Sequence, residues 1–154
     1  MTTTTTDRIE KHIVLGAPRA RVWRALTDSK EFGTWFQSIF TEPFRLGSRV
    51  KGRITYPGYE HFTMEIDIEA MEPERLFAFR WHPYAVDPAA DYSKEPMTLI
   101  EFTLEEAEGG TLLRVVESGF DKIPIERRAE ALKRNEGGWA EQMKNIERYL
   151  DRNP

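Results

Sequence analysis

The C-terminal stretch NEGGWAEQMKNIERYL, residues 135–150, decides the fold because it extends an apolar repeat that begins further upstream. The repeat alternates steps of four and three residues through Ile125, Ala129, Leu132, Glu136, Trp139, Met143, Ile146 and Leu150. Such spacing places side chains on one face of an α-helix. We therefore expect one continuous helix from Pro124 to Leu150, roughly 40 Å long at about 1.5 Å per residue.

The same stretch contains two features that a fully packed helix does not need. Gly137 and Gly138 are adjacent in the helix interior, where two glycines cost about 1–2 kcal/mol relative to alanine. Glu136 occupies a position of the apolar repeat, and a carboxylate facing a dry core is costly unless it is paired or protonated. Both features fit a helix that faces a wet or ligand-filled hollow. The glycines would also allow the helix backbone to come close to the sheet. The alternative is a kink or break at the glycines, with Glu136 reaching solvent there.

Upstream of this helix the hydrophobic pattern mostly has period two, which is typical of strands with one covered face. Strands are predicted at residues 9–15, 39–44, 49–56, 62–68, 76–81, 97–104 and 112–117. Short helices are expected at residues 19–26 and 30–35, and Gly109–Gly110 indicate a hairpin turn. Short turns and the lack of βαβ alternation predict an α+β fold with a meandering antiparallel sheet. The one long connection, residues 82–96, is expected to be a lid, a binding loop or a mobile segment.

Glu117 is a second carboxylate on an apolar face. It shares one side of its predicted strand with Leu113 and Val115, so a helix packed on that side would bury it. Glu117 and Glu136 would then approach one interior region from two elements. In the alternative, Glu117 forms a cap or a salt bridge at the end of the strand.

Composition excludes several classes of function. The chain has 154 residues, 40% hydrophobic and 31% charged, which fits one folded domain, expected over residues 9–152. The net charge of −4 gives no electrostatic footprint for nucleic acid, and no apolar run is long enough to span a bilayer. Because the chain has no cysteine, disulfides, thiolate catalysis and zinc–thiolate sites are excluded.

The first residues and the histidines carry no targeting or metal signal. MTTTTTDR, residues 1–8, lacks the apolar segment of a signal peptide and is expected to be a disordered tail, with the cytoplasm as default location. His12, His61 and His82 lie on separate predicted elements without metal-ligand spacing, and no phosphate-binding, dinucleotide-binding or serine-hydrolase motif occurs. We therefore expect neither a metal nor another cofactor.

Several segments together resemble the SRPBCC superfamily. IVLGAPRARVWRALTD, residues 13–28, followed by Trp35 and Phe36, resembles the opening of these proteins. LFAFRWHP (76–83), TLIEFTLEEAEGGTLLRVVESGF (98–120) and the C-terminal stretch are similar to later motifs of the branch named after the activator of heat-shock-protein ATPase. This branch is related to START-type lipid-binding domains and plant pollen allergens. The resemblance covers residues 9–150.

The resemblance implies a helix-grip fold, in which a curved antiparallel sheet wraps a long C-terminal helix and two short helices close one end. It also implies a cavity between sheet and helix that commonly holds an apolar ligand. The residues then expected to bind the ligand are Trp35, Phe36, Ile54, Met64, Phe79, Trp81, Phe102, Glu117, Glu136, Trp139 and Met143. The loop at residues 83–96 is the expected lid.

Three functional hypotheses of different classes follow. In the first, the protein is a non-enzymatic binder of a small apolar or amphipathic molecule, whose polar end is oriented by Glu117 and Glu136. In the second, it is an enzyme of the cyclase or hydrolase kind that uses these two acids, one with a pKa raised by burial. In the third, it is a chaperone-associated interaction module with an exposed surface patch. The sequence fits a monomer or a homodimer.

Overall fold

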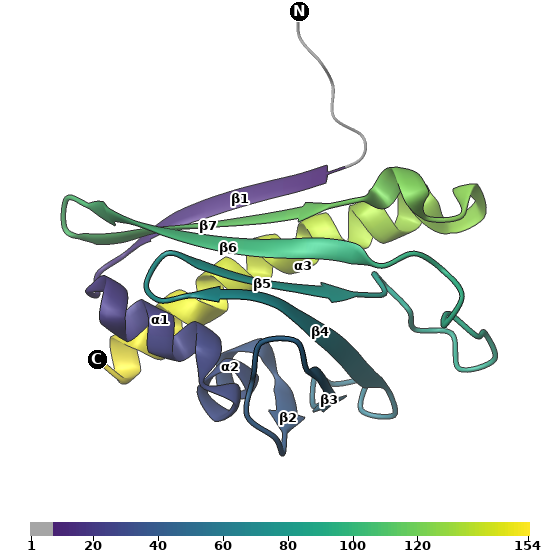
Figure 1. The fold of residues 1–154 in the computed structure, drawn as a ribbon, viewed down its shortest axis with the longest axis horizontal. Coiled ribbons are helices and arrows are strands. Elements are labelled where there is room, and N and C mark those ends of the chain that lie inside the picture. The colour runs from purple at the N-terminus through teal and green to yellow at the C-terminus, as the bar shows by residue number, and fades with distance from the viewer. Residues whose placement is uncertain (1–7) are drawn as a thin grey trace, which may run out of the picture.

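A curved seven-stranded antiparallel sheet is the frame of the protein (Figure 1). The computed structural model describes residues 8–154. Across the sheet the strands are β1 (Arg8–Leu15), β7 (Gly110–Ser118), β6 (Thr98–Ala107), β5 (Leu76–Trp81), β4 (Thr63–Glu72), β3 (Arg49–Ile54) and β2 (Ser38–Phe40). From β2 to β7, neighbours in the sheet are consecutive in the chain, and β1 pairs with β7. The predicted antiparallel meander is therefore confirmed.

The helices occupy one side and one end of this sheet (Figure 1). The long helix α3 (Ile125–Arg152) is continuous through both glycines, so the predicted single helix is confirmed. Glu136 nevertheless reaches solvent, as the alternative expected. Two short helices, α1 (Arg19–Thr27) and α2 (Ser29–Phe36), lie near the C-terminal end of α3, and the 3₁₀ turn η1 (Phe120–Lys122) precedes it. Asp28 caps α2, since its carboxylate accepts hydrogen bonds from the backbone N–H groups of Lys30 and Glu31 at 3.0 and 3.1 Å.

Side chains alternate between the two faces of each strand, and those on the inner face form an aromatic core. Phe77, Phe79 and Phe102 are fully buried on the central strands, and Phe32 of α2 joins them with its ring 6.1 Å from that of Phe79. Burial of each such side chain stabilises the fold by about 1.5–3 kcal/mol. The predicted tail, residues 1–8, lies outside the described residues except for Arg8, which begins β1.

The apolar repeat predicts the buried residues of α3 correctly only in the C-terminal half of the helix. Trp139, Met143, Ile146 and Leu150 are buried, as predicted. Upstream the prediction is wrong, because Ala129 and Glu136 are exposed and Ile125 is 71% exposed, whereas Ala131 is buried. The reason is geometric: an α-helix has 3.6 residues per turn, so a seven-residue repeat drifts by about 20° per heptad and the upstream positions rotate away from the sheet.

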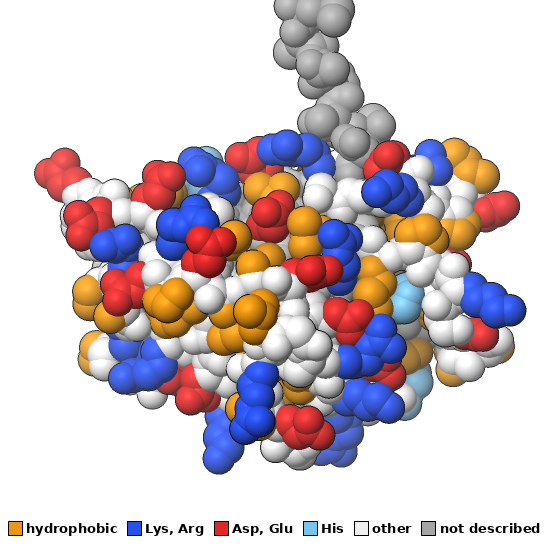
Figure 2. Space-filling view, viewed as in Figure 1, with side chains coloured by type: hydrophobic (Ala, Val, Ile, Leu, Met, Phe, Trp, Pro, Cys, Tyr) orange, Lys and Arg blue, Asp and Glu red, His pale blue; other side chains and the backbone are white. Residues whose placement is uncertain are grey.

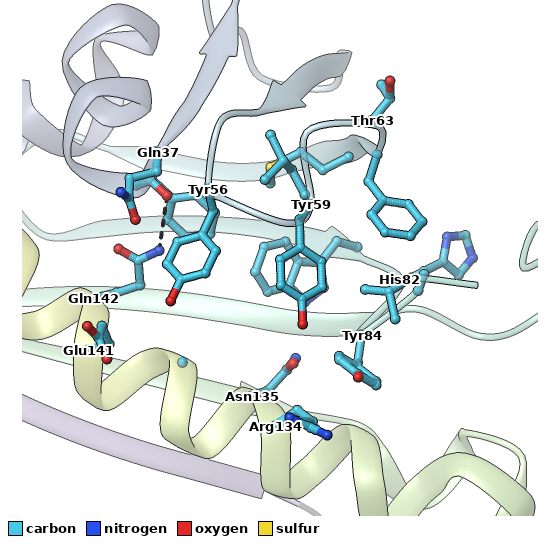
Figure 3. A pocket seen from close by; sticks show the side chains of 18 of the residues that line it. Gln37, Tyr56, Tyr59, Thr63, His82, Tyr84, Arg134, Asn135, Glu141 and Gln142 are labelled. Atoms are coloured by element: carbon cyan, nitrogen blue, oxygen red, sulfur yellow. Dashed lines mark hydrogen bonds between the residues drawn. The ribbon is translucent and has the colours of Figure 1, made fainter. Parts of the chain in front are cut away.

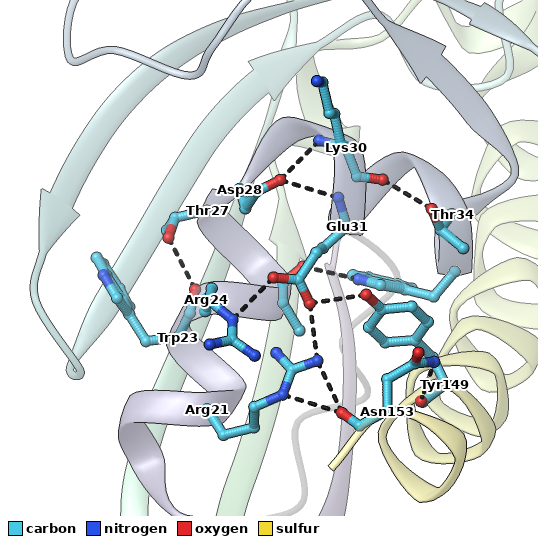
Figure 4. Close-up of polar contacts among 12 residues, drawn as sticks. Arg21, Trp23, Arg24, Thr27, Asp28, Lys30, Glu31, Thr34, Tyr149 and Asn153 are labelled. Atoms are coloured by element: carbon cyan, nitrogen blue, oxygen red, sulfur yellow. Dashed lines mark hydrogen bonds and ion pairs between the residues drawn. The ribbon is translucent and has the colours of Figure 1, made fainter.

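A polar cluster joins α1 and α2 to the C-terminal end of α3 (Figure 4). The guanidinium of Arg21 lies 2.8 Å from the Glu31 carboxylate and also donates to the backbone carbonyl of Asn153 at 2.8 and 3.0 Å. The Tyr149 hydroxyl donates to Glu31 at 2.7 Å. Partial burial opposes ionisation of Glu31, but the hydrogen bonds from Tyr149 and Arg21 hold its pKa below the ordinary value. The cluster therefore ties the C-terminal end of α3 to both short helices.

Charged side chains of both signs are interspersed over the face seen in Figure 2. Charged residues of neighbouring strands also pair, since Arg49 donates to Asp67 at 2.6 Å and Arg80 donates to Glu69 at 2.5 Å. This face therefore presents no continuous patch of one charge. Within residues 8–154, none of the helices combines the length and the apolar character needed to cross a bilayer.

Candidate functional site

A cavity of about 560 Å³ lies between α3 and the β3–β5 side of the sheet (Figure 3). Ile54, Met64 and Trp81 contribute to it from the strands, and two loops, residues 55–62 between β3 and β4 and residues 82–97 between β5 and β6, complete the wall. The side of α3 that borders it is mainly polar and consists of Arg134, Asn135, Gly137, Gly138, Glu141, Gln142 and Asn145. The volume falls in the range of about 300–1,000 Å³ that is typical of small-molecule sites.

Tyrosine dominates the loop walls of the cavity. Four of the five tyrosines of the chain line it: Tyr56 and Tyr59 from the β3–β4 loop, and Tyr84 and Tyr92 from the β5–β6 loop. The hydroxyls of Tyr56 and Tyr59 point across the cavity towards α3 (Figure 3). Because a tyrosine offers an apolar ring and one polar group, such a wall can contact an apolar body and still hydrogen-bond a substituent.

The glycines of α3 form an open part of the opposite wall. A Cβ atom built on Gly137 or Gly138 would meet no neighbouring atom within 4 Å. The space beside them is therefore not filled by the sheet, and both residues border the cavity instead. The absence of two side chains keeps this stretch of helix surface flat and accessible.

Glu117 lies behind the cavity wall, fully buried. One carboxylate oxygen accepts hydrogen bonds from the indole of Trp139 at 2.8 Å and the amide of Asn135 at 3.0 Å. The other accepts from the indole of Trp81 at 2.7 Å and the hydroxyl of Thr98 at 2.5 Å. Burial raises the pKa of Glu117 above its ordinary value, although the four donors oppose this effect.

The two indoles that Glu117 holds form an aromatic base for the cavity. The rings of Trp81 and Trp139 are stacked, with centroids 5.6 Å apart and an interplanar angle of 24°. Phe36 packs against both, at 5.9 and 6.0 Å. Trp81 and Phe36 line the cavity, whereas Trp139 borders only a recess of about 80 Å³. Glu117 thus acts on the cavity through Trp81, whose orientation it fixes.

The structure divides the residues predicted to bind a ligand into three groups. Phe36, Ile54, Met64 and Trp81 lie on the cavity wall. A second group is buried and does not line the cavity: Trp35, Phe79, Phe102, Glu117, Trp139 and Met143. The indole N–H of Trp35, for example, donates to the backbone carbonyl of Ala25 at 2.9 Å.

Glu136 forms the third group alone, and the prediction that it faces inward is wrong. It is exposed, and its carboxylate lies 3.9 Å from the ammonium of Lys11 on β1, away from the cavity. The inward polar residue of this turn is its neighbour Asn135. The predicted convergence of two carboxylates therefore does not occur. Spacing alone does not separate positions 135 and 136, because they flank the direction of Trp139 by similar angles.

The β5–β6 loop is fastened to α3 by one arginine. Arg127 donates to the carboxylate of Glu95 at 2.6 and 2.8 Å and to the backbone carbonyl of Pro83 at 2.8 Å. Its guanidinium also lies 4.8 Å from the ring centroid of Tyr92. Arg127 therefore binds both ends of the loop, and it holds the segment that carries two of the cavity tyrosines.

Several residues of the cavity were missed from the sequence. The four tyrosines lie in loops, where hydrophobic periodicity gives no information. A usable signal existed, since four of five tyrosines fall in two segments bounded by turn residues. The polar residues of α3 were missed because its inward face was assigned from the heptad repeat. Within residues 8–154 no group of three or more acidic or histidine side chains has the arrangement of a metal site.

Comparison with known proteins agrees with this geometry. A family model described as Activator of Hsp90 ATPase homolog 1-like protein matches residues 16–151. The chain belongs to this family. The resemblance seen in the sequence is thereby confirmed, and the observed sheet and helices match the helix-grip fold of this group. No protein of curated function matches at a significant level.

Several solved structures share the fold of this chain at low sequence identity. Protein MLL2253 from Mesorhizobium loti is 23% identical, with 96% of this chain and 98% of that chain covered and a TM-score of 0.75. Protein NE0264 from Nitrosomonas europaea is 16% identical, with 98% of each chain covered and a TM-score of 0.74. Aha1 from Colwellia psychrerythraea, solved in solution as a dimer, is 17% identical, with 91% and 92% covered and a TM-score of 0.68.

Proposed function

We propose that this protein binds a small, mainly apolar molecule in the cavity between α3 and the sheet, and that it acts as a binder rather than as an enzyme. The observation that carries the proposal is the open space beside Gly137 and Gly138, in a cavity of about 560 Å³ whose opposite wall is tyrosine-rich. A helix that only had to cover a sheet would gain stability from almost any other residue at these two positions.

The arrangement of acids supports binding over catalysis. A pair of acids at one site was the basis of the catalytic hypothesis, and Glu136 lies outside the cavity. The oxygens of Glu117 are engaged by donors of the protein itself, behind the cavity wall. A ligand in the cavity would meet the ring of Trp81 rather than the carboxylate that orients it.

The test combines a ligand screen with a variant that fills the cavity. Lipids, aromatic compounds and polyketides are screened by thermal shift, because a ligand that binds only the folded state raises Tm by mass action. Each hit is titrated against Gly138→Leu, whose new side chain would project into the space beside the glycine. The control is Ala140→Leu, at an exposed position of the same helix that does not border the cavity.

We expect Gly138→Leu to raise Tm in the absence of ligand, because leucine is the better helix former, and to weaken binding of the hits at least tenfold. Since the variant is more stable than the wild type, its loss of binding cannot be attributed to unfolding. Ala140→Leu should bind as the wild type does. A screen without hits, or hits that bind equally to Gly138→Leu, would contradict the proposal.

A further inference from the structure

We propose that the ligand of this cavity carries an acidic group, such as a carboxylate, that binds the guanidinium of Arg134. This inference rests on the proposed function and names the chemistry of the ligand at one end of the same site. Arg134 lies on the third turn of α3 and borders the cavity next to Asn135 (Figure 3).

The donors of Arg134 are available for a ligand. Among the described residues its nearest carboxylate is that of Glu130, at 3.7 Å on the same exposed helix surface, and it makes no hydrogen bond to the protein. An exposed pair of this kind contributes little, so the pair does not prevent exchange for a better-placed anion. A guanidinium presents several N–H groups in one plane, which suits the two oxygens of a carboxylate.

Arg134 is also held in position by the loop it faces. Its guanidinium lies 5.5 Å from the ring centroid of Tyr84, in the range of a cation–π contact. Tyr84 has a left-handed backbone with φ of 46°, and the adjacent carbonyl of Pro83 accepts a hydrogen bond from Arg127 at 2.8 Å. Strained residues fixed in this way are common at ligand-binding positions. The hydrogen bonds of Arg127 therefore position the Tyr84 ring, on which Arg134 stacks, before any ligand binds.

The other charged residues that line the cavity favour a position of the ligand's acidic group near Arg134. Glu65 lies 3.6 Å from Lys51 and 3.7 Å from Arg49, so its charge is balanced on the sheet. Glu141, seven residues after Arg134, lies about 10 Å further along the helix axis and carries a negative charge at the opposite end. A ligand with a single acidic group is attracted to Arg134, whereas a second acidic group near Glu141 would be repelled.

The ligand class that fits is a flat apolar body with one acidic end. The body would lie between the tyrosines and the glycine surface of α3, with its uncharged end towards Glu141. The probes are anilinonaphthalene sulfonate and uncharged anilinonaphthalene, which differ only by the acidic group. Both are titrated by fluorescence against the wild type, Arg134→Gln and the control Lys133→Gln, which removes a neighbouring charge that does not border the cavity.

We expect the sulfonate to bind the wild type about fivefold more tightly than the uncharged probe, the effect of about 1 kcal/mol from a partly exposed charge pair. Arg134→Gln should remove this difference without changing the affinity for the uncharged probe, and Lys133→Gln should change neither. Equal affinities in the wild type, or a difference that persists in Arg134→Gln, would overturn the inference while leaving the proposed function standing. If Gly138→Leu weakens the binding of neither probe, the proposed function itself fails.

Discussion

Replacement of Glu117 by glutamine tests how the aromatic base of the cavity is held. The carboxylate accepts hydrogen bonds from two indoles, one amide and one hydroxyl. A glutamine has one acceptor oxygen, and its amide is a donor. If the oxygen keeps Trp139 and Asn135, the new amide faces Thr98 and Trp81. The Thr98 hydroxyl can rotate and accept, but the Trp81 indole N–H has no such alternative.

The expected cost of Glu117→Gln is therefore that of one buried donor without an acceptor, about 1–3 kcal/mol. For a chain of this length 1 kcal/mol corresponds to about 2–4 °C in Tm, so a decrease of several degrees is expected. Urea unfolding followed by fluorescence gives the free energy directly. Because Trp81 lines the cavity, its altered orientation should also weaken binding of any ligand found in the screen.

The cost of this variant should depend on pH. Burial raises the pKa of Glu117, so the folded state favours protonation of this carboxyl more than the unfolded state does. Its contribution to the free energy of unfolding is fully present below the ordinary value of 4.5 and is lost as pH rises through the raised pKa. Glutamine does not titrate. The stability difference between wild type and Glu117→Gln should therefore be largest near pH 4 and should decrease as pH increases.

A double-mutant cycle can refute this reasoning. In a Trp81→Phe background no indole N–H is left without an acceptor, so Glu117→Gln should cost less than it does in the wild type. An equal cost in both backgrounds would show that the assigned hydrogen-bond geometry is wrong. A stability difference that increases with pH would show that the pKa of Glu117 is lowered rather than raised.

Three further variants test other parts of the structure. Gly137→Ala should increase the free energy of unfolding by about 0.5–1 kcal/mol, because the new Cβ meets no atom within 4 Å, and a decrease measured by urea unfolding would contradict an open helix surface. Arg127→Gln should release the β5–β6 loop, seen as faster amide exchange confined to that loop; unchanged exchange would show that Arg127 does not fasten it. Trp35→Phe should lower the free energy of unfolding by about 1–3 kcal/mol, because the hydrogen bond to the Ala25 carbonyl is lost. Ligand affinity should not change, since Trp35 does not line the cavity, and a loss of affinity would show that Trp35 contributes to the site.

The fold was predictable because its signals are local and repeated. Period-two alternation located the strands within a few residues, and the long helix was recognised despite its glycines. Two strands were predicted too long, at residues 39–44 instead of Ser38–Phe40 and at residues 49–56 instead of Arg49–Ile54. The first ends early because Pro43 cannot donate to a ladder and the chain leaves the sheet before it. Glu117 was recognised as inward-facing for the same reason as its apolar neighbours, since side chains two residues apart share a face.

The cavity was only partly predictable because it depends on rotation about α3 and on loops. The polar residue at the cavity wall is Asn135, whereas the heptad repeat predicted its neighbour Glu136, which lies on the outside. A heptad repeat is too coarse to distinguish these two positions. The tyrosines reach the cavity from two connections, and the course of the β5–β6 connection depends on tertiary contacts of the Arg127 side chain. No periodic pattern in the sequence encodes those contacts.

Four residues around the cavity depart from the most stable choice at their positions. Gly137 and Gly138 weaken a helix that contacts nothing at those positions. Glu117 is a buried acid behind the wall, and Tyr84 adopts a left-handed backbone on the opposite side. Each of these departures is unfavourable taken alone. The core between the sheet and the C-terminal half of α3 has regular apolar packing instead. The proposed function accounts for the open glycine surface, because a wall that must stay open for a ligand lacks the side-chain packing that would close it.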